Sequence, residues 1–539
     1  MTAATPATAP SVAAARLGRS TLAVSGWNAV SRASGFARVL VVGAALGATF
    51  LGNTYQSANL VSTVTFELLA AGLLSAPLVP AFVGLLDRGD EAAAHRLAST
   101  LLGLSLGALG ALTLVMAVGG RWVMELLTAG VDQPGVRAAE VRLGAFLLWF
   151  FLPQMLLYAA GAVATALLNA RRRFAAAAFA PVANNVVVIA TMAAFLAVTP
   201  TGRRGLELPL ASRLVLAVGT TAGVLAMAAV PVVALARAGS RLRPRVDLAA
   251  PGLRSVARMG AWGAVLLAAV QVLVGVTLVL ANRVEGGVVA YQIAFTFFLL
   301  PFALVAHPIF TTLHPRLSSA AHARRWDDFG ADVAAGLGRT LVLVVPFAAV
   351  LAVLARPALD LVRLGALDAG DAGLVARVLA AYALGLGGYA AFQLLARAAT
   401  AADRARLAAG VGVAVAAGGT LLMVAGSRAA SGSDRVVALG LAHSAAMTVG
   451  AVALLVLLRR SVGTPVRVGA AAGRAAAAGL AAAAAAAAGA GLAHGTGRAA
   501  ALLDLGAGGV LGVAAAGAVL WALRAPEVAA LLARAGVSR

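Results

Sequence analysis

Residues 22–47, LAVSGWNAVSRASGFARVLVVGAALG, form the stretch on which the assignment of the fold depends. A helix crosses a bilayer with about 20 mostly apolar residues, and this stretch is long enough. It nevertheless carries Arg32 and Arg38 inside the apolar run. A charged side chain at the bilayer centre costs at least ~2.5 kcal/mol, so such residues face protein or water rather than lipid. The stretch therefore predicts a transmembrane helix beside a hydrated cavity.

Apolar runs of this length recur from end to end and predict an all-α polytopic membrane protein of about fourteen transmembrane helices. Of the 539 residues, 61% are hydrophobic and only 12% are charged, which is too little charge to cover a soluble protein of this size. The predicted helices span residues 22–47, 54–85, 98–127, 141–169, 174–199, 209–236, 255–282, 286–315, 333–355, 373–399, 405–426, 436–458, 468–493 and 499–523. Twelve helices remain the alternative, because the alanine-rich C-terminal runs can be assigned in two ways.

The arginines indicate the orientation. All 42 basic residues are arginine, and the segments assigned to the side of the N-terminus hold 27 of them against 13 on the other side. Because cytoplasmic loops carry the excess of basic residues, we expect a protein of the bacterial cytoplasmic membrane with both termini in the cytoplasm. The arginines are expected to contact membrane lipids. We expect no nucleic-acid partner, since no basic domain stands apart from the apolar runs.

A weak internal repeat divides the chain. Residues 158–173, YAAGAVATALLNARRR, resemble residues 389–404, YAAFQLLARAATAADR, at an offset of 231. Transporters built from two such halves bind substrate between them. The predicted domains are a disordered cytoplasmic tail (1–20), an N-terminal lobe of six helices (21–237), a basic cytoplasmic linker (238–254), a C-terminal lobe of six helices (255–460), and two further helices with a short cytoplasmic tail (461–539).

The polar residues of the first predicted helix lie on one face. Asn28, Ser31, Arg32, Gly35 and Arg38 fall within an arc of roughly 120°. The planar guanidinium group binds phosphate through two hydrogen bonds, so this face predicts a site for an anionic group. The alternative is that one or both arginines reach the cytoplasmic surface or form structural pairs.

The second predicted helix has a matching polar face that contains Asn59, Thr63 and Glu67. Glu67 is the acid that the sequence places firmly inside a span, and it is expected to pair with Arg32 or Arg38. That pair is either purely structural or a gate that opens when a substrate phosphate competes for the arginine. Both polar faces are therefore candidate parts of one substrate-binding cavity.

The sequence contains no catalytic or cofactor motif. It has no HExxH, GxSxG or Walker A sequence and no cysteine, so we expect neither an enzyme nor a metal or thiolate site. Without an ATP-binding motif, transport would be coupled to the membrane potential, to an ion gradient or to substrate concentration.

Several motifs resemble those of one family of lipid flippases. SRASGFAR at residues 31–38 resembles the S-R-x-x-G-F-x-R signature of the MurJ/MviN family, a branch of the MOP exporter superfamily. The resemblance continues in order along nearly the whole chain. The further matching segments are LVPAF at 78–82, ALLN at 166–169, RF at 173–174, AFAP at 178–181 and PRLS at 315–318.

This resemblance implies a V-shaped fold of two lobes and fourteen helices around a cationic cavity. It also implies a flippase that moves the undecaprenyl-pyrophosphate-linked peptidoglycan precursor, lipid II, from the inner to the outer leaflet by alternating access, with Arg32 and Arg38 on the pyrophosphate. Cell-wall synthesis proteins are then expected partners. The alternatives are an exporter of another lipid-linked oligosaccharide or of a drug, and a non-transporting membrane scaffold for cell-wall synthesis.

The chain departs from the better-known members at three places. It has Val39 where they have Asp after the second arginine, Phe66 and Glu67 where they carry an arginine pair, and Phe295 and Thr296 where they carry Asp-Arg. The resemblance therefore implies a divergent member of the actinobacterial type with a less cationic cavity, a paralogue with a different lipid-linked substrate, or a member that no longer transports.

Overall fold

The computed structural model describes residues 12–74, 78–200, 205–362, 365–492 and 497–527, and all regular structure in these ranges is helical. The helices of the N-terminal lobe are α1 (Val12–Leu46), α2 (Phe50–Leu74), α3 (Leu78–Leu86), α4 (Glu91–Leu127), α5 (Pro134–Phe151), α6 (Gln154–Ala170), α7 (Ala175–Val198) and α8 (Leu210–Arg237). The helices of the C-terminal lobe are α9 (Leu253–Ala281), α10 (Gly287–Pro301), the π-helical turn η2 (Phe302–Ala306), α11 (His307–His322), α12 (Trp326–Val353), α13 (Ala355–Val362), α14 (Ala369–Ala383), α15 (Leu386–Ala401), α16 (Ala405–Ala429) and α17 (Asp434–Val462). Two more helices, α18 (Gly469–Ala490) and α19 (Arg498–Ala522), follow.

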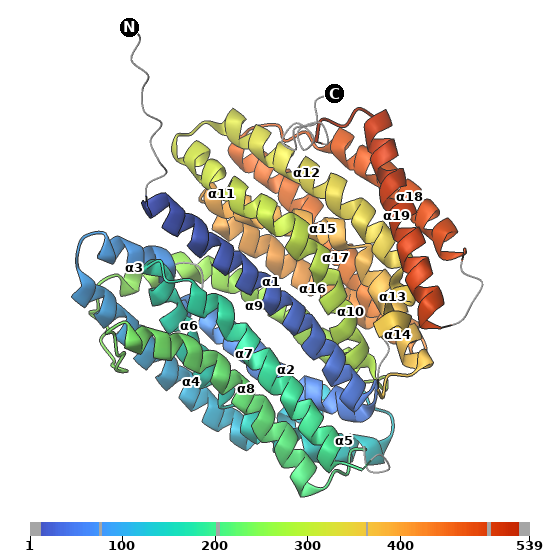
Figure 1. Cartoon of the computed structure of the whole chain (residues 1–539). Helices are drawn as coiled ribbons and strands as arrows, with labels where there is room; N and C mark the ends of the chain where they lie inside the picture. Colours follow the sequence, from blue (N-terminus) through green and yellow to red (C-terminus); the bar gives the residue numbers. More distant parts are fainter. Residues whose placement is uncertain (1–11, 75–77, 201–204, 363–364, 493–496, 528–539) are drawn as a thin grey trace.

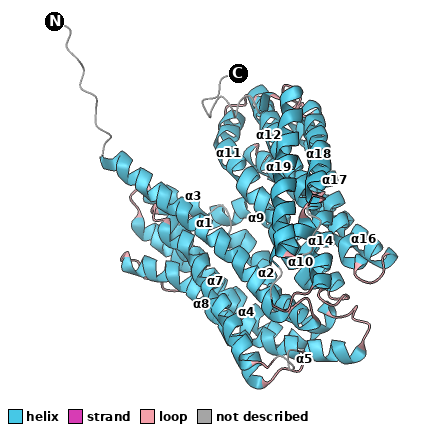
Figure 2. Cartoon of the chain, turned by 45° about the vertical axis from the view of Figure 1, so that its right-hand side comes forward, coloured by secondary structure: helices cyan, strands magenta, loops and turns pink. Residues whose placement is uncertain are grey.

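The two lobes form separate bundles, and α1 runs along the boundary between them (Figure 1). Seen from the side, the bundles meet at the end where α10 and α14 begin (Figure 2). In the N-terminal lobe α1 packs on α7, and it also contacts α10 of the C-terminal lobe. A second contact between the lobes joins α2 to α9. The first two helices of each half therefore form the boundary.

Within the described residues, twelve helices are long and apolar enough to cross a membrane, or thirteen if α14 and α15, which meet at a bend of 48°, form one span. The all-α polytopic class is confirmed, whereas the predicted count of fourteen is not. The predicted second span, 54–85, corresponds to α2 and α3, and the residues between them, 75–77, lie outside the described part.

The predicted ends of the first and eighth spans also differ from the structure. Helix α1 begins at Val12, so residues 12–20, predicted to be disordered, are helical, while residues 1–11 lie outside the described part. The predicted span 286–315 continues through η2 and α11 to His322. The π-helical turn lies directly after Pro301, whose missing N–H interrupts the α-helical hydrogen-bond pattern.

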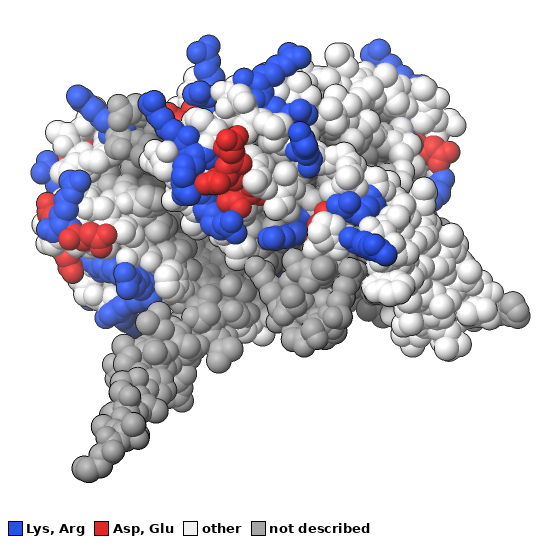
Figure 3. Space-filling model, turned by 90° about the horizontal axis from the view of Figure 1, so that it is seen from above, with Lys and Arg blue, Asp and Glu red and all other residues white. Residues whose placement is uncertain are grey.

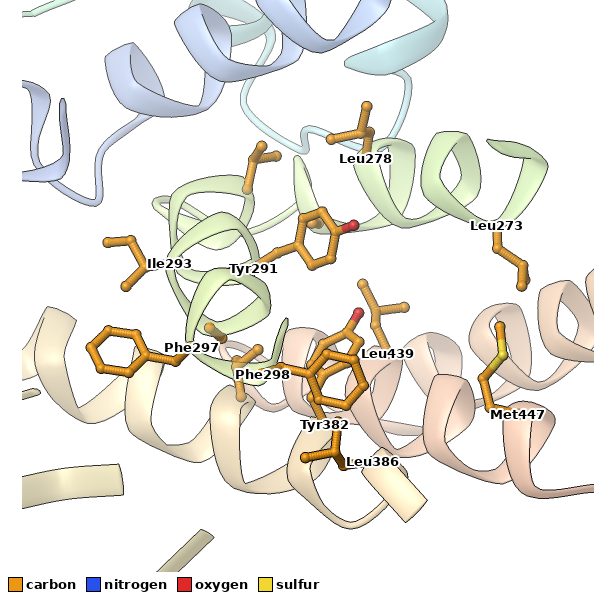
Figure 4. Packing of buried hydrophobic residues seen from close by; sticks show 14 of the residues in the cluster. Leu273, Leu278, Tyr291, Ile293, Phe297, Phe298, Tyr382, Leu386, Leu439 and Met447 are labelled. Atoms are coloured by element: carbon orange, nitrogen blue, oxygen red, sulfur yellow. The ribbon is translucent and has the colours of Figure 1, made fainter. Parts of the chain in front are cut away.

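The core of the C-terminal lobe is built around α10. Phe298 is fully buried and makes an edge-to-face contact with the fully buried Tyr382 of α14. Figure 4 shows these two rings close together, with Leu386 of α15 and Leu439 of α17 beside them. On the outward side of α10, Phe297 packs edge-to-face on Phe36 of α1 with ring centroids 4.8 Å apart. The same helix thus anchors the C-terminal lobe and forms one wall of the boundary between the lobes.

Small residues determine where the last two helices lie. Helix α18 is almost entirely alanine and glycine, and it packs on α19 and α12. A Cβ atom at Gly489 would lie 2.6 Å from the Cα of Gly508, so the two helices approach to backbone contact. Such close approach is the usual basis of helix association in lipid.

Ion pairs between different segments form two groups, one at each end of the bundle. One group contains Arg96–Asp247, Arg171–Glu91, Arg316–Asp332 and Arg474–Glu527. The other contains Arg142–Glu207, Arg377–Asp434 and Arg435–Asp132. Each pair joins two segments that the sequence predicts on the same side of the membrane. The alternation of sides along the chain is therefore consistent with the folded structure.

The linker between the lobes, predicted at 238–254, lies against α4. The Arg245 N–H donates to Ser99 O at 3.2 Å, and a Cβ at Gly103 would lie 2.1 Å from Arg245 O. Arg96 Nε donates to Asp247 Oδ2 at 2.5 Å, and this hydrogen bond holds the pKa of Asp247 below its ordinary value. The linker is thus a docked segment rather than a loose connection.

Candidate functional site

The polar face of α1 opens into a groove between the lobes. A cavity of about 440 Å³ is lined by all five predicted α1 residues, and Thr296, Leu299 and Leu300 of α10 form the opposite wall. The α1 residues are Asn28, Ser31, Arg32, Gly35 and Arg38. Arg32 is exposed and Arg38 is half-buried. The structure therefore brings these residues together on a single surface that both lobes share.

Hydrogen bonds from the N-terminal lobe hold this part of α1 in place. Asn185 Nδ2 of α7 donates to Ser34 Oγ at 2.9 Å and lies 3.4 Å from Ser31 O. A Cβ at Gly35 would lie 3.5 Å from the same nitrogen, which is ordinary contact. The amide thus fixes the rotation of α1, and the arginines face the groove rather than α7.

A second cavity of about 260 Å³ continues from the groove into the N-terminal lobe. It shares Arg38 and Val39 with the groove, and it contains the predicted residues Asn59 and Thr63 of α2. Its remaining polar lining comes from Tyr55, Gln56, Tyr158, Asn184, Thr220 and Gln292. Arg38 therefore lies at the junction of two connected spaces, in a wall of neutral hydrogen-bonding groups.

Glu67 is not the partner of either arginine, which corrects the prediction from sequence. Its Oε2 accepts a short hydrogen bond from Gln271 Nε2 of α9, and no ion pair joins it to Arg32 or Arg38 among the described residues. The polar face of α2 is wide enough to place Asn59 and Thr63 in the inner cavity while Glu67, one and two turns further on, meets the C-terminal lobe. The carboxylate therefore bridges the lobes, and it does not directly neutralise the arginines.

The sequence reasoning missed a second acid inside the lobe. Glu140 of α5 is fully buried, and its Oε1 lies 3.1 Å from Thr54 Oγ1. The predicted span began at residue 141, one residue too late to include it. Helix α5 begins at Pro134, a favoured first helical residue, and that signal would have placed Glu140 inside the span.

The far end of the inner cavity is sealed where the lobes meet. The fully buried Asn53 of α2 uses both atoms of its amide: its Nδ2 donates to Val284 O at 2.8 Å, and its Oδ1 accepts from the Val288 N–H at 3.0 Å. Asn282 Nδ2 donates to Ser57 Oγ at 3.0 Å in the same layer. We call this layer, residues 47–57 against residues 282–289, the seam.

Backbone contacts close the rest of the seam. A Cβ at Gly286 would lie 2.3 Å from Ala48 O, and Gly286 has a φ of +69° that favours glycine. The Ala366 N–H donates to Ala44 O at 2.7 Å and adds the α13–α14 turn to the seal. The structure is therefore open at the end where α1 begins and closed at the end where α1 finishes.

This arrangement suits binding and movement of a charged headgroup better than catalysis. Among the described residues no group of His, Asp and Glu side chains is placed to hold a metal ion. The groove offers two guanidinium groups at one side and apolar side chains at the other, which matches an amphiphile with an anionic head.

Comparisons with known proteins agree with this geometry. A family model described as lipid II flippase MurJ matches residues 42–500. "Lipid II flippase MurJ" of Burkholderia cenocepacia is 28% identical over 386 residues, which cover 70% of this chain and 72% of that protein. "Probable lipid II flippase MurJ" of Synechocystis is 26% identical over 372 residues, which cover 68% of each chain.

Solved structures share the fold. A lipid II flippase MurJ in an inward closed conformation superimposes with a TM-score of 0.71 at 17% identity, over 93% of this chain and 99% of that chain. An inward-facing multidrug resistance MATE transporter of the MOP superfamily superimposes with a TM-score of 0.65 at 13% identity, over 80% of this chain and 94% of that chain. Since the family model covers most of the sequence, the chain belongs to the lipid II flippase MurJ family.

Proposed function

We propose that this protein is a flippase that translocates the undecaprenyl-pyrophosphate-linked peptidoglycan precursor, lipid II, from the inner to the outer leaflet. The observation that carries the proposal is the position of Arg38, which lines both the groove and the inner cavity. A diphosphate that enters past Arg32 would meet a second guanidinium group before it leaves the groove.

The depth of the arginines fits this path. With a rise of about 1.5 Å per residue, Arg38 lies roughly 12 Å and Arg32 roughly 21 Å along α1 from the sealed end at Leu46. A hydrocarbon core is about 30 Å thick, so both lie within it. Moving a bare anion through hydrocarbon costs tens of kcal/mol. Guanidinium groups and the polar lining would replace the lost water, while the polyprenyl chain stays in the lipid.

The open end of the groove faces the cytoplasm in this proposal. Figure 3 shows that end of the molecule, where arginine side chains spread over both lobes and outnumber the acids. An excess of arginine is typical of the cytoplasmic side. Both termini are then cytoplasmic, and the seam faces outward. Translocation requires the seam to open while the lobes close over the groove.

Energy would come from the membrane potential or an ion gradient, because the chain lacks a nucleotide-binding motif. Each elementary charge that crosses the membrane gains about 2.3 kcal/mol per 100 mV, which is enough to bias two states of similar energy.

The test is rescue of lipid II translocation in a host depleted of its own flippase. The wild-type chain should restore exposure of lipid II in the outer leaflet, and the double variant Arg32→Ala, Arg38→Ala at matched abundance should not. Exposure can be measured by an impermeant enzyme that cleaves exposed lipid II. Rescue by the double variant would favour the scaffold alternative, and growth without lipid II exposure would favour another exported substrate.

A further inference from the structure

The fully buried carboxyl group of Glu140 has too few hydrogen-bond donors for an ionised acid. Its Oε2 has no hydrogen-bond partner, and its Oε1 meets only the hydroxyl of Thr54. Both arginines of α5 are used elsewhere: Arg137 donates to Glu125 O, and Arg142 pairs with Glu207. A buried carboxylate normally has a cationic partner or several donors.

The hydrogen count at Thr54 indicates which form of Glu140 the structure accommodates. Thr54 Oγ1 lies 2.8 Å from Phe50 O and 3.1 Å from Glu140 Oε1, but the hydroxyl has one proton. With ionised Glu140 both neighbours are acceptors, so one of them stays unsatisfied. With protonated Glu140, the acid donates to Thr54 and the hydroxyl donates to Phe50 O. The neutral acid therefore satisfies the Thr54 hydroxyl and Phe50 O, and an unpartnered oxygen of a neutral acid costs less to bury than one of a carboxylate.

Charged groups on the surrounding elements do not reverse this balance. Helix α5 packs against α2, α4, α6 and α8. Arg121 and Glu125 of α4 pair with each other, and Arg213 of α8 donates to Leu208 O. Tyr55, beside Thr54, shares a hydrogen bond with Thr220, and Tyr158 of α6 lines the inner cavity.

In the turn between α9 and α10, Arg283 forms no ion pair among the described residues, and Glu285 adds a negative charge that opposes ionisation of Glu140.

The site is directly coupled to the seam. Thr54 follows Asn53 in the chain. The Asn53 side-chain amide forms hydrogen bonds with the backbone of Val284 and Val288, and Glu285 lies between these two residues in the sequence. Ionisation of Glu140 would create a negative charge that is repelled by Glu285, close in sequence to the Asn53 contact through Thr54. The same ionisation becomes favourable when the lobes separate and water reaches the carboxylate, because hydration removes the cost of burial.

We propose that Glu140 is a proton-binding site that links opening of the seam to protonation from the outer side of the membrane. When the seam is closed, the carboxylic acid keeps its proton and donates a hydrogen bond to the Thr54 hydroxyl. When the seam opens, the proton passes to water, and reclosure requires its return. The inference rests on the proposed orientation but not on the proposed substrate.

The absence of cysteine allows a direct test by thiol labelling. Val289 is almost fully buried in the seam against Gly52, so Val289→Cys reports seam opening in intact cells through an impermeant maleimide added outside. Labelling rates are divided by that of Gly135→Cys, an exposed cysteine at the same end, because the thiolate fraction itself rises with pH. Raising the external pH from about 6 to about 8 should increase this relative rate several-fold. Glu140→Gln in the same background should keep the relative rate low at both pH values.

Two further variants keep the test decisive. Glu207→Gln removes an exposed acid at the same end and should leave the pH response unchanged. Glu285→Gln removes the opposing charge and should move the midpoint of the response to lower pH. Because the Glu285 side chain is exposed, this substitution should leave the fold unchanged. An unchanged pH response in Glu140→Gln, or labelling of the parent that rises with pH only as much as that of Gly135→Cys, would overturn the proposal. Neither result bears on lipid II exposure, so the proposed flippase activity stands or falls separately.

Discussion

Asn53 and Val288 lie 235 positions apart in the chain and meet at the seam, where the Val288 N–H donates to Asn53 Oδ1 at 3.0 Å. The other half of the contact joins Asn53 to Val284, at a separation of 231 residues. This separation equals the offset of the internal repeat. The seam therefore lies where the equivalent second helices of the two halves begin, and it closes the cavity along the boundary about which the lobes would rock.

Asn53→Ala should weaken the seam. The change leaves Val284 O and the Val288 N–H buried without a partner, which costs roughly 1–3 kcal/mol for each group. We expect a lower unfolding temperature in detergent and faster outside labelling of Val289→Cys. Asn59→Ala, which alters the inner cavity away from the seam, is the matched control for labelling. Equal labelling rates in the two variants would show that Asn53 does not hold the lobes together.

Gly286→Ala should also disturb the seam, through the backbone. Alanine in the left-handed region costs roughly 1–2 kcal/mol, and its Cβ would lie 2.3 Å from Ala48 O. We expect loss of the closed state, detected as rapid outside labelling of Val289→Cys. At Gly263 of α9 nothing lies within 4 Å of the added Cβ. In the Gly263→Ala background, Val289→Cys should therefore be labelled slowly. Equally fast labelling with both substitutions would show that the effect of Gly286→Ala does not come from its contact with Ala48.

Arg38→Ala should reduce lipid II exposure by a factor of roughly 10–150, which corresponds to loss of one charge-assisted hydrogen bond of about 1.5–3 kcal/mol. Arg38→Lys should retain part of the activity, because lysine keeps the charge but not the two-pronged geometry. The measurement is enzymatic cleavage of exposed lipid II at matched protein abundance. Arg88→Ala, an exposed arginine away from both cavities, should behave as wild type. Full activity of Arg38→Ala would remove the basis of the proposed binding site.

Docking of the linker on α4 should depend on pH through Asp247. Its pKa is lowered in the folded state, first by the hydrogen bond from Arg96, so the stabilisation is present above the ordinary pKa of 3.8 and is lost as the pH falls through the lower folded value. We expect linker cleavage by an acid-active protease to accelerate below about pH 4. Asp247→Asn should show fast cleavage already at higher pH. A rate in this variant equal to that of wild type above pH 4 would show that the pair does not hold the linker.

The sequence identified the polar face of α1 because helical periodicity is local. Asn28, Ser31, Arg32, Gly35 and Arg38 share an arc in any α-helix, and a charge within an apolar run must avoid lipid wherever the helix lies. The same reasoning gave the helical class and the alternation of sides. It did not give the bend in the predicted tenth span, because a bent helix and a continuous helix have the same apolar composition.

The partners of the polar residues depended on the fold. From sequence, Glu67 was expected to pair with an arginine, since opposite charges within two adjacent spans attract; packing of α2 on α9 turns it to Gln271 instead. Glu140 and Asn53 have no local pattern that marks them, because their contacts join segments 86 to 235 residues apart. Sequence alone thus determined which side chains could not face lipid, since that follows from local hydropathy and charge. Only the tertiary structure decided which of them meet across the two lobes, since that depends on packing between distant helices.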